Sequence, residues 1–321
     1  MIYMNLFSFL NRRESPITIG IIGAGKFATM FFAQALKIPS FHIVGVVDIV
    51  PENAKSNLQI AGWNLASFDT TSLSDAYSSG KTFISEDWQS LISHDSIEII
   101  IECTGNPNSA VEHCLTAFQN NKNVINVTVE ADAFCGFALS QKAKEAGVIY
   151  SMAYGDQPAL ACELIDWART CGFNVVAAGR GHKWLKHFQQ STPDTVWEYW
   201  GLTKEKAERG RLNPKMFNAF LDGSKPAIES TAIANTSNLL APSNGLIFPS
   251  GGIDDIPTLM RPISEGGVLE GKGMVDVVSC LTPDGKQIPY DIRKGVWVVF
   301  EADTEYLLSL IHISEPTRPI H

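Results

Sequence analysis

The sequence lacks an excess of positive charge. Its 25 Lys and Arg residues are outnumbered by 34 Asp and Glu residues, which gives a net charge of −9. Because nucleic-acid phosphates attract basic surfaces, this balance argues against a nucleic-acid partner, although a local basic pocket for a phosphorylated metabolite stays open. No apolar run approaches the roughly 18 residues that a membrane span needs. Met1–Glu14 runs from apolar to basic, the reverse of a secretory signal, and predicts a cytoplasmic protein.

Several chemical motifs are also missing. The six cysteines form no C-x-x-C pair, which favours buried reduced thiols over zinc ligands or disulfides. The absence of G-x-S-x-G and P-loop patterns removes hydrolase and kinase functions. There is no H-x-x-x-H spacing, so no ligand pattern supports a metal site. A divalent metal held by carboxylate oxygens, such as those of Glu130, Asp132 or Asp156, is an open alternative.

What the sequence does contain is a glycine-rich turn after a short apolar run, in the stretch Ile17–Met30. Gly23, Gly25 and Ala28 fit the G-x-G-x-x-G/A fingerprint of a dinucleotide-binding βαβ unit. In that motif the first glycine permits a tight turn, and the second lets a pyrophosphate approach the helix N-terminus. The cofactor-binding residues predicted here are Gly23, Gly25, Lys26, Phe27 and Ala28.

The following segments supply the context that this motif needs. Apolar strand patterns alternate with helical spacing up to residue 155, which predicts an α/β fold with a doubly wound parallel Rossmann sheet in domain 1–155. The expected strands are 17–22, 42–48, 96–102, 123–129 and 148–152. Residues 63–82 are expected to be irregular, and a helix is expected over 133–146.

Polar residues at the predicted strand ends complete the cofactor site. Asp48 lies 25 positions after Gly23, where a Rossmann unit places the carboxylate that binds the adenine ribose. Its alternative role is a helix cap before Pro51. Thr104, Gly105 and Asn106 follow a later strand and are expected on the nicotinamide side. Three acids, Glu130, Asp132 and Asp156, are expected at strand ends facing the cofactor, where they could serve as acid/base groups. Helix capping is the default role of Asp132 and an alternative for Asp156.

The second half of the chain predicts an α+β catalytic domain, 156–306, on an open mixed sheet. Its expected elements are a helix over 158–171, helical spacing over 192–210, and strands at 174–181, 273–280 and 295–302. Residues 307–321 resemble translated adapter read-through and are interpreted as a non-native tail, with a genuine tail as the alternative.

Lysines are the best candidates for the catalytic groups of this domain. A lysine can polarise a carbonyl, donate a proton or hold a phosphate. Lys183 and Lys225 each follow a glycine-rich segment and have polar neighbours; the alternative is that they are ordinary surface lysines. The predicted catalytic set is Lys183, Lys225, Asp222 and Asp156, and the predicted substrate-binding set is Arg180, His182 and Lys215.

Longer motifs resemble a known family. They are G-D-Q-P-A-L at 155–160, G-R-G-H-K-W-L at 179–185, N-P-K-M-F at 213–217 and F-L-D-G-S-K-P-A-I-E at 220–229. The segments 129–134 and 289–293 agree as well. Together they resemble the deoxyxylulose-phosphate reductoisomerase-like oxidoreductases, with an N-terminal half similar to homoserine dehydrogenase, over residues 17–306.

The resemblance implies an NADPH-dependent homo-oligomer that converts 1-deoxyxylulose 5-phosphate into methylerythritol phosphate, an isoprenoid precursor. Rearrangement of the carbon skeleton and reduction would need a polarised carbonyl and a held phosphate, roles that suit Lys183, Lys225 and Arg180. The Asp222–Lys225 segment is similar to the acid and lysine of homoserine dehydrogenase.

Two features depart from that family. Its members continue into a C-terminal SAF-type domain, which is missing here. Asp48 also disfavours the 2′-phosphate of NADP, although Lys26 could compensate, so NAD and NADP both stay open. The rival hypotheses are a dehydrogenase of another small hydroxy or carbonyl compound, and a non-catalytic NAD(P)-binding regulatory module.

Overall fold

The computed structural model of the chain describes residues 8, 10, 12–210 and 212–307. The chain forms two compact units, Met1–Ala153 and Tyr154–His321. None of the helices in the described residues is both long and apolar enough to cross a membrane. Of the predicted tail 307–321, all but Leu307 lies outside the described residues.

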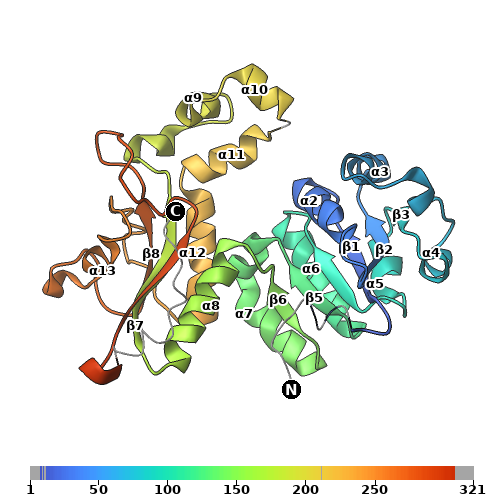
Figure 1. Ribbon diagram of the computed structural model, residues 1–321, viewed down its shortest axis with the longest axis horizontal. Coiled ribbons are helices and arrows are strands. Elements are labelled where there is room, and N and C mark those ends of the chain that lie inside the picture. Colours follow the sequence, from blue (N-terminus) through green and yellow to red (C-terminus); the bar gives the residue numbers. More distant parts are fainter. Residues whose placement is uncertain (1–7, 9, 11, 211, 308–321) are drawn as a thin grey trace. The chain divides into compact units, whose positions relative to one another are not determined.

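The first unit is built on a parallel sheet of six strands in the order β3-β2-β1-β4-β5-β6 (Figure 1). This is the strand order of a dinucleotide-binding Rossmann fold, so the predicted fold class is confirmed. The strands are β1 (Ile17–Ile22), β2 (Phe41–Val47), β3 (Phe83–Ser85), β4 (Ile99–Glu102), β5 (Asn123–Asn126) and β6 (Tyr150–Met152).

Helices cover both faces of this sheet because successive strand side chains point to opposite faces. In β4, Ile100 packs with the cluster that includes α4 to α7, whereas Ile101 packs with the cluster that includes α2 and α3. The helices are α2 (Lys26–Ala35), α3 (Pro51–Ile60), α4 (Leu73–Ser79), α5 (Trp88–Ser93), α6 (Pro107–Gln119) and α7 (Val129–Ala146), with a 3₁₀ turn at Leu65–Phe68.

The sequence predictions for two segments of this unit were wrong. The segment 63–82 is not irregular, since it holds the 3₁₀ turn and α4, and the short strand β3 after it was missed. The strand predicted over 123–129 ends at Asn126, and α7 begins at Val129 rather than at residue 133. The Asn126 side chain donates to the Thr128 carbonyl at 3.0 Å, which holds the chain in the turn between strand and helix.

The second unit contains a three-stranded mixed sheet in the order β8-β7-β9. The strands are β7 (Asn174–His182), β8 (Met274–Ser279) and β9 (Val296–Glu301). β7 pairs parallel with β8 and antiparallel with β9, as the prediction of an open mixed sheet requires. A Cβ on Gly179 would lie 1.8 Å from the Asp276 carbonyl oxygen, so only glycine fits this close approach of two strands.

Helices flank the central strand of this sheet as well. Ile165 of α8 (Gln157–Thr170) and Ile233 of α12 (Ser224–Ser237) pack on Ala178, while Ile256 of α13 (Ile256–Leu259) packs in a second cluster with Ala177. A third cluster involves α9 (Val196–Trp200) and α11 (Pro214–Leu221). α10 (Lys204–Arg209) and two 3₁₀ turns, Lys186–Gln190 and Ile263–Glu265, complete the unit.

Candidate functional site

The glycine turn of the first unit has the shape that a dinucleotide needs. Gly23 has a φ of 95°, and a Cβ there would lie 2.8 Å from the backbone carbonyl of Cys103. Gly25 begins α2 with no side-chain cap, and a Cβ there would meet no atom within 4 Å. The start of α2 therefore has room beside Gly25 and no side-chain cap on its first N–H groups, which fits a pyrophosphate.

Asp48 holds this turn in place. One carboxylate oxygen accepts from the N–H of Ala24 at 2.8 Å, and the other accepts from the N–H of Val50 at 2.9 Å. Asp48 is not the cap of α3, because the N-cap of that helix is Val50. Each carboxylate oxygen has a second lone pair, so the group can still accept from ribose hydroxyls. Lys26 is exposed beside the turn, Phe27 is half-buried, and Ala28 is buried.

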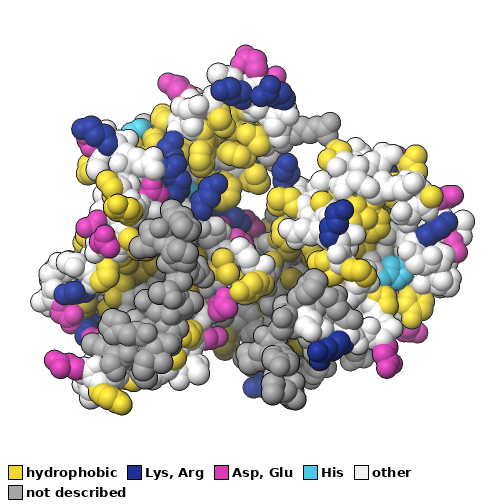
Figure 2. Space-filling view, viewed as in Figure 1, with side chains coloured by type: hydrophobic (Ala, Val, Ile, Leu, Met, Phe, Trp, Pro, Cys, Tyr) yellow, Lys and Arg dark blue, Asp and Glu magenta, His cyan; other side chains and the backbone are white. Residues whose placement is uncertain are grey.

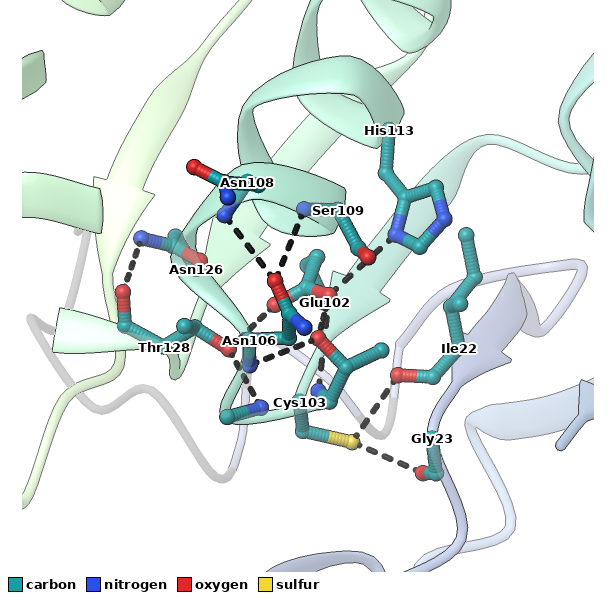
Figure 3. A network of polar contacts seen from close by, with 12 residues as sticks. Ile22, Gly23, Glu102, Cys103, Asn106, Asn108, Ser109, His113, Asn126 and Thr128 are labelled. Carbon is teal, nitrogen blue, oxygen red and sulfur yellow. Dashed lines mark hydrogen bonds and ion pairs between the residues drawn. The ribbon is translucent and has the colours of Figure 1, made fainter. Parts of the chain in front are cut away.

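A polar network lies at the ends of β4 and β5 (Figure 3). The carboxylate of Glu102, which is fully buried, accepts from the hydroxyl of Thr104 at 2.6 Å and from the hydroxyl of Thr128. The Thr128 oxygen accepts from the N–H of Gly105 at 3.0 Å, and the Thr104 oxygen accepts from the N–H of Asn106 at 3.2 Å. The three predicted loop residues are thus tied to one carboxylate.

His113 and Asn106 anchor the same network to α6. His113 Nδ1 lies 3.2 Å from Glu102 Oε1, and the His113 ring makes an edge contact with Trp88 at 4.7 Å between centroids. The Asn106 side chain caps α6 by accepting from the N–H groups of Asn108 and Ser109, as Figure 3 shows.

The acidic residues predicted at the next strand end lie inside α7. Asp132 is buried and accepts from the hydroxyl of Tyr150 at 2.6 Å and from the amide of Asn126 at 2.9 Å, so the expected helix-capping role is wrong. Burial and the Asp132 charge raise the pKa of the Tyr150 hydroxyl. Glu130 is half-buried in the first turn of α7.

Arg180, in the middle strand of the second unit, forms a buried ion pair. Its guanidinium contacts Glu229 of α12, and the two side chains are 4% and 1% exposed. Burial lowers the pKa of Arg180 to about 10, against the opposing effect of the Asp156 charge. Asp156 itself caps α8 through the N–H of Gln157 at 2.9 Å, which was one of its two interpretations, and its catalytic role stays a prediction. The charge of Arg180 is therefore compensated within the unit.

His182 lies buried at the end of β7, and its predicted part in substrate binding stays a prediction. Its Nε2 lies 2.5 Å from the Phe220 carbonyl oxygen. Burial, and then the charge of Arg180, lower the pKa of His182 to about 4. The ring is therefore neutral near pH 7 and donates Nε2–H to this carbonyl, which ties β7 to the end of α11.

Lys183 occupies a half-buried site directly after β7. Its Nζ donates to the Tyr199 carbonyl at 2.8 Å and lies 5.4 Å from the ring centroid of Trp200. Burial, and then the neighbouring charge of Arg293, lower the pKa of this amine, while Cys280 opposes the shift. A lysine with these surroundings has the features of a proton donor.

The α11–α12 junction lies against the same end of β7. The Asp222 carboxylate accepts from the Ser224 N–H at 2.9 Å and from the Asn218 amide at 3.0 Å, so it stabilises the junction. A Cβ on Gly223 would lie 3.2 Å from the indole nitrogen of Trp184, the residue after Lys183. Lys225 is in the first turn of α12.

One predicted substrate-binding residue lies apart from the others. Lys215 is exposed in the first turn of α11, at the other end of that helix from Asp222. Figure 2 shows Lys and Arg side chains beside apolar side chains in the region of α9, α10 and α11. Among the described residues, no group of three or more His, Cys, Asp or Glu side chains could hold a metal ion.

Sequence reasoning missed the two carboxylates that are most deeply buried in the described part of the chain. Glu102 closes the apolar strand β4, and Asp276 interrupts the apolar strand β8. Asp276 accepts from the N–H groups of Ile247 and Phe248, and burial raises its pKa to about 6. The signal that could have found both is an acid within a run of otherwise apolar strand residues.

All six cysteines lie within the described residues, and each is a free thiol there. Cys114 and Cys280 are buried, but the other four are half-buried, so the expectation of burial holds for two of them.

The first unit has a glycine turn on a Rossmann sheet, and the second has a mixed sheet with a lysine at a strand end. Together these features define an NAD(P)-dependent oxidoreductase class. The family model described as "Oxidoreductase DRL, catalytic domain" matches residues 155–315, half of the chain, and the chain belongs to this family. The model of the Gfo/Idh/MocA family, described as "Oxidoreductase family, NAD-binding Rossmann fold", matches residues 17–154. NAD(P) is thus the cofactor of this class, and the glycine turn fits it.

Three of the solved structures that the chain matches are dehydrogenases or oxidoreductases. An NAD binding oxidoreductase from Klebsiella pneumoniae is 16% identical over 53% of this chain and 43% of its own, with a TM-score of 0.37. A scyllo-inositol dehydrogenase from Lactobacillus casei is 16% identical over 53% and 47%, with a TM-score of 0.34. A homoserine dehydrogenase from Thiobacillus denitrificans is 15% identical over 70% and 50%, with a TM-score of 0.47.

The chain spans about half the length of the solved structures that it matches. No curated protein matches it significantly.

These matches correct the resemblance drawn from the sequence motifs. The two domain models are those of the Gfo/Idh/MocA Rossmann domain and the DRL catalytic domain. The assignment to a deoxyxylulose-phosphate reductoisomerase-like family with a homoserine dehydrogenase-like N-terminal half is therefore wrong, and the expected SAF-type domain and isoprenoid role lose their support.

Proposed function

We propose that this protein reduces the carbonyl group of a small anionic compound with NAD(P)H, with Lys183 as the proton donor. NAD(P)H supplies the hydride when it is bound at the glycine turn. The observation that carries the proposal is the environment of Lys183. Its amine is half-buried, has a lowered pKa, and is oriented by a hydrogen bond to the Tyr199 carbonyl.

The chemistry of the second unit follows from this amine. A carbonyl oxygen gains negative charge as its carbon accepts hydride, and a nearby ammonium group both stabilises that charge and gives up a proton. A lowered pKa makes the proton transfer from Lys183 easier near neutral pH. The contact with the Tyr199 carbonyl limits the directions in which the side chain can point.

An anionic group on the substrate is supported by the charges beside this lysine. Arg293 is close enough to lower the pKa of Lys183, its side chain is 35% exposed, and its ion pair with Asp291 is long, at 3.8 Å, so the guanidinium keeps donors for an anion. Arg180 is less suited to this role, since Glu229 already compensates its charge. A phosphate or carboxylate bound by Arg293 would in turn stabilise the ammonium form of Lys183.

The proposal is tested by mixing the purified chain with NADPH or NADH and a panel of small phosphorylated and carboxylated carbonyl compounds, and following cofactor absorbance. 1-Deoxyxylulose 5-phosphate belongs in the panel because its conversion needs a polarised carbonyl and a held phosphate. Lys183→Met should lower kcat by a factor of about 10² or more, the usual contribution of a positioned proton donor. The dissociation constant of NAD(P)H should stay unchanged.

Two comparisons sharpen this result. Lys186→Met removes an exposed lysine three residues after Lys183, outside every predicted site, and should retain wild-type kcat. Lys225→Met tests whether the lysine of α12 also belongs to the site. Activity that survives Lys183→Met would refute the assignment of the donor, whereas tight NAD(P)H binding without oxidation by any compound would favour a regulatory module. The homo-oligomer and the NADP or NAD preference stay predictions, which sedimentation and paired cofactor titrations test.

A further inference from the structure

The buried carboxylate of Glu102 is the feature that the proposed chemistry leaves unused. It is the last residue of β4 and has 0% exposure. A charge buried in this way is costly unless hydrogen bonds compensate it. Its four hydrogen-bond contacts come from the hydroxyl and N–H of Thr104, the hydroxyl of Thr128 and the ring of His113.

The chemistry of a carboxylate sets the direction of these hydrogen bonds. An ionised carboxylate accepts only, so both threonine hydroxyls must donate their single proton to Glu102. Their oxygens are then left as acceptors, and each accepts from the loop: Thr128 from the N–H of Gly105, and Thr104 from the N–H of Asn106. One side chain thereby determines the conformation of three successive loop residues.

This loop also lies against the glycine turn of the same unit. β1 and β4 are neighbours where the strand order reverses, the place where doubly wound sheets bind their ligands. The Cys103 thiol donates to the Gly23 carbonyl at 2.9 Å, as Figure 3 shows, and a Cβ on Gly23 would lie 2.9 Å from the Thr104 nitrogen. Asp48 lies at the end of β2, on the other side of β1.

We propose that Glu102 is a positioning residue for the cofactor, which holds the Thr104–Asn106 loop in the conformation that contacts the nicotinamide half of NAD(P). The proposal rests on NAD(P) binding by the first unit. The adenosine half lies toward Asp48 and does not depend on this loop. Loss of the carboxylate therefore weakens one half of the cofactor's contacts and leaves the other half intact.

Binding measurements separate the two halves. The dissociation constants of NADH and of ADP-ribose, which lacks nicotinamide, are measured by calorimetry for the wild type and for Glu102→Gln; NADPH and 2′-phospho-ADP-ribose replace them if NADPH binds more tightly. In the variant, an NH2 group replaces one carboxylate oxygen and faces a threonine hydroxyl. That hydroxyl oxygen already accepts from a loop N–H, so the amide cannot replace the acceptor that Glu102 provides. We expect NADH binding to weaken by about tenfold or more, equivalent to about 1.4 kcal/mol, and ADP-ribose binding to stay within about twofold.

A matched pair at Thr128 covers the case in which Glu102→Gln does not fold. Thr128→Val has nearly the same shape but removes the oxygen that accepts from Gly105, whereas Thr128→Ser keeps it. The valine variant should lose NADH affinity selectively, and the serine variant should bind as the wild type does.

Equal loss of NADH and ADP-ribose binding in the valine variant would overturn the proposal, because it would show a general disruption of the unit. Unchanged NADH binding would overturn it as well. A wild-type chain that binds neither compound would instead refute the cofactor site itself, and the proposal with it.

Discussion

Replacing the two glycines of the turn after β1 by alanine should have different effects: one variant should lose stability, and the other should lose cofactor affinity. Gly23 is buried, has a φ of 95°, and a Cβ there would lie 2.8 Å from the backbone of Cys103. Gly25 is exposed, has a φ of −75°, and has open space where a Cβ would be. Gly23→Ala should therefore destabilise the protein, whereas Gly25→Ala should leave its stability unchanged.

The expected magnitude for Gly23→Ala has two parts. A left-handed backbone conformation costs a non-glycine residue roughly 1–2 kcal/mol. Fitting a methyl group against the backbone of β4 adds about 1–3 kcal/mol, as overpacking does elsewhere. The sum, about 2–5 kcal/mol, is a large part of the roughly 5–15 kcal/mol that stabilises a typical protein. In a unit of this size it corresponds to a fall in Tm of about 4–20 °C, at roughly 2–4 °C per kcal/mol.

The assay combines thermal unfolding with titration of NADH and NADPH. Gly25→Ala should unfold at the wild-type temperature but lose cofactor affinity, since its methyl group occupies the space through which a pyrophosphate approaches the N-terminus of α2. Wild-type stability of Gly23→Ala would refute the backbone geometry of the turn. Wild-type affinity of Gly25→Ala would refute the position of the pyrophosphate.

Two further predictions concern buried charges of the second unit. Glu229→Ala leaves Arg180 buried without its partner and should lower the free energy of unfolding by about 3–5 kcal/mol; a loss below about 1 kcal/mol in urea would contradict the ion pair. Burial raises the pKa of Asp276 from 3.8 to about 6, so the folded state keeps its proton where the unfolded state has lost it. Stability should therefore fall by about 3 kcal/mol in total as pH rises from about 3 to about 7, with about 2 kcal/mol of that loss between the two pKa values. Asp276→Asn should lack this part of the slope, and identical slopes would contradict the assignment.

The fold of the first unit could be predicted because its signals are local. The glycine turn, the apolar strands and the residues at the strand ends are each readable within a few positions. The errors arose where two local patterns overlap. N-V-I-N-V-T-V at 123–129 alternates like a strand, but the amide of Asn126 bonds to the Thr128 carbonyl and a helix follows at once. β3 has only three residues, too few for a periodic pattern.

The partners of the site residues could not be predicted because they are distant in the sequence. Arg180 was expected to bind an anionic substrate, but Glu229, 49 positions later, pairs with it inside the unit. His182 was expected to join the same pocket, but the Phe220 carbonyl engages it. Spacing along a chain identifies which residue types lie near a strand end. It carries no information on which of these side chains already bind a partner within the protein.

Buried acids within apolar strands combine a local sequence signal with partners that are distant in the sequence. A carboxylate at such a position must be compensated by N–H or O–H donors, and loops at strand ends are where unpaired donors occur. Glu102 meets this need with the loop beside the glycine turn. Asp276 meets it with the N–H of Phe248, whose ring stacks on Trp184 at 4.3 Å, next to Lys183. In each unit, an acid that is costly to bury holds a loop beside the proposed chemistry, so such an acid is a sequence signal for the site that can be searched for without a structure.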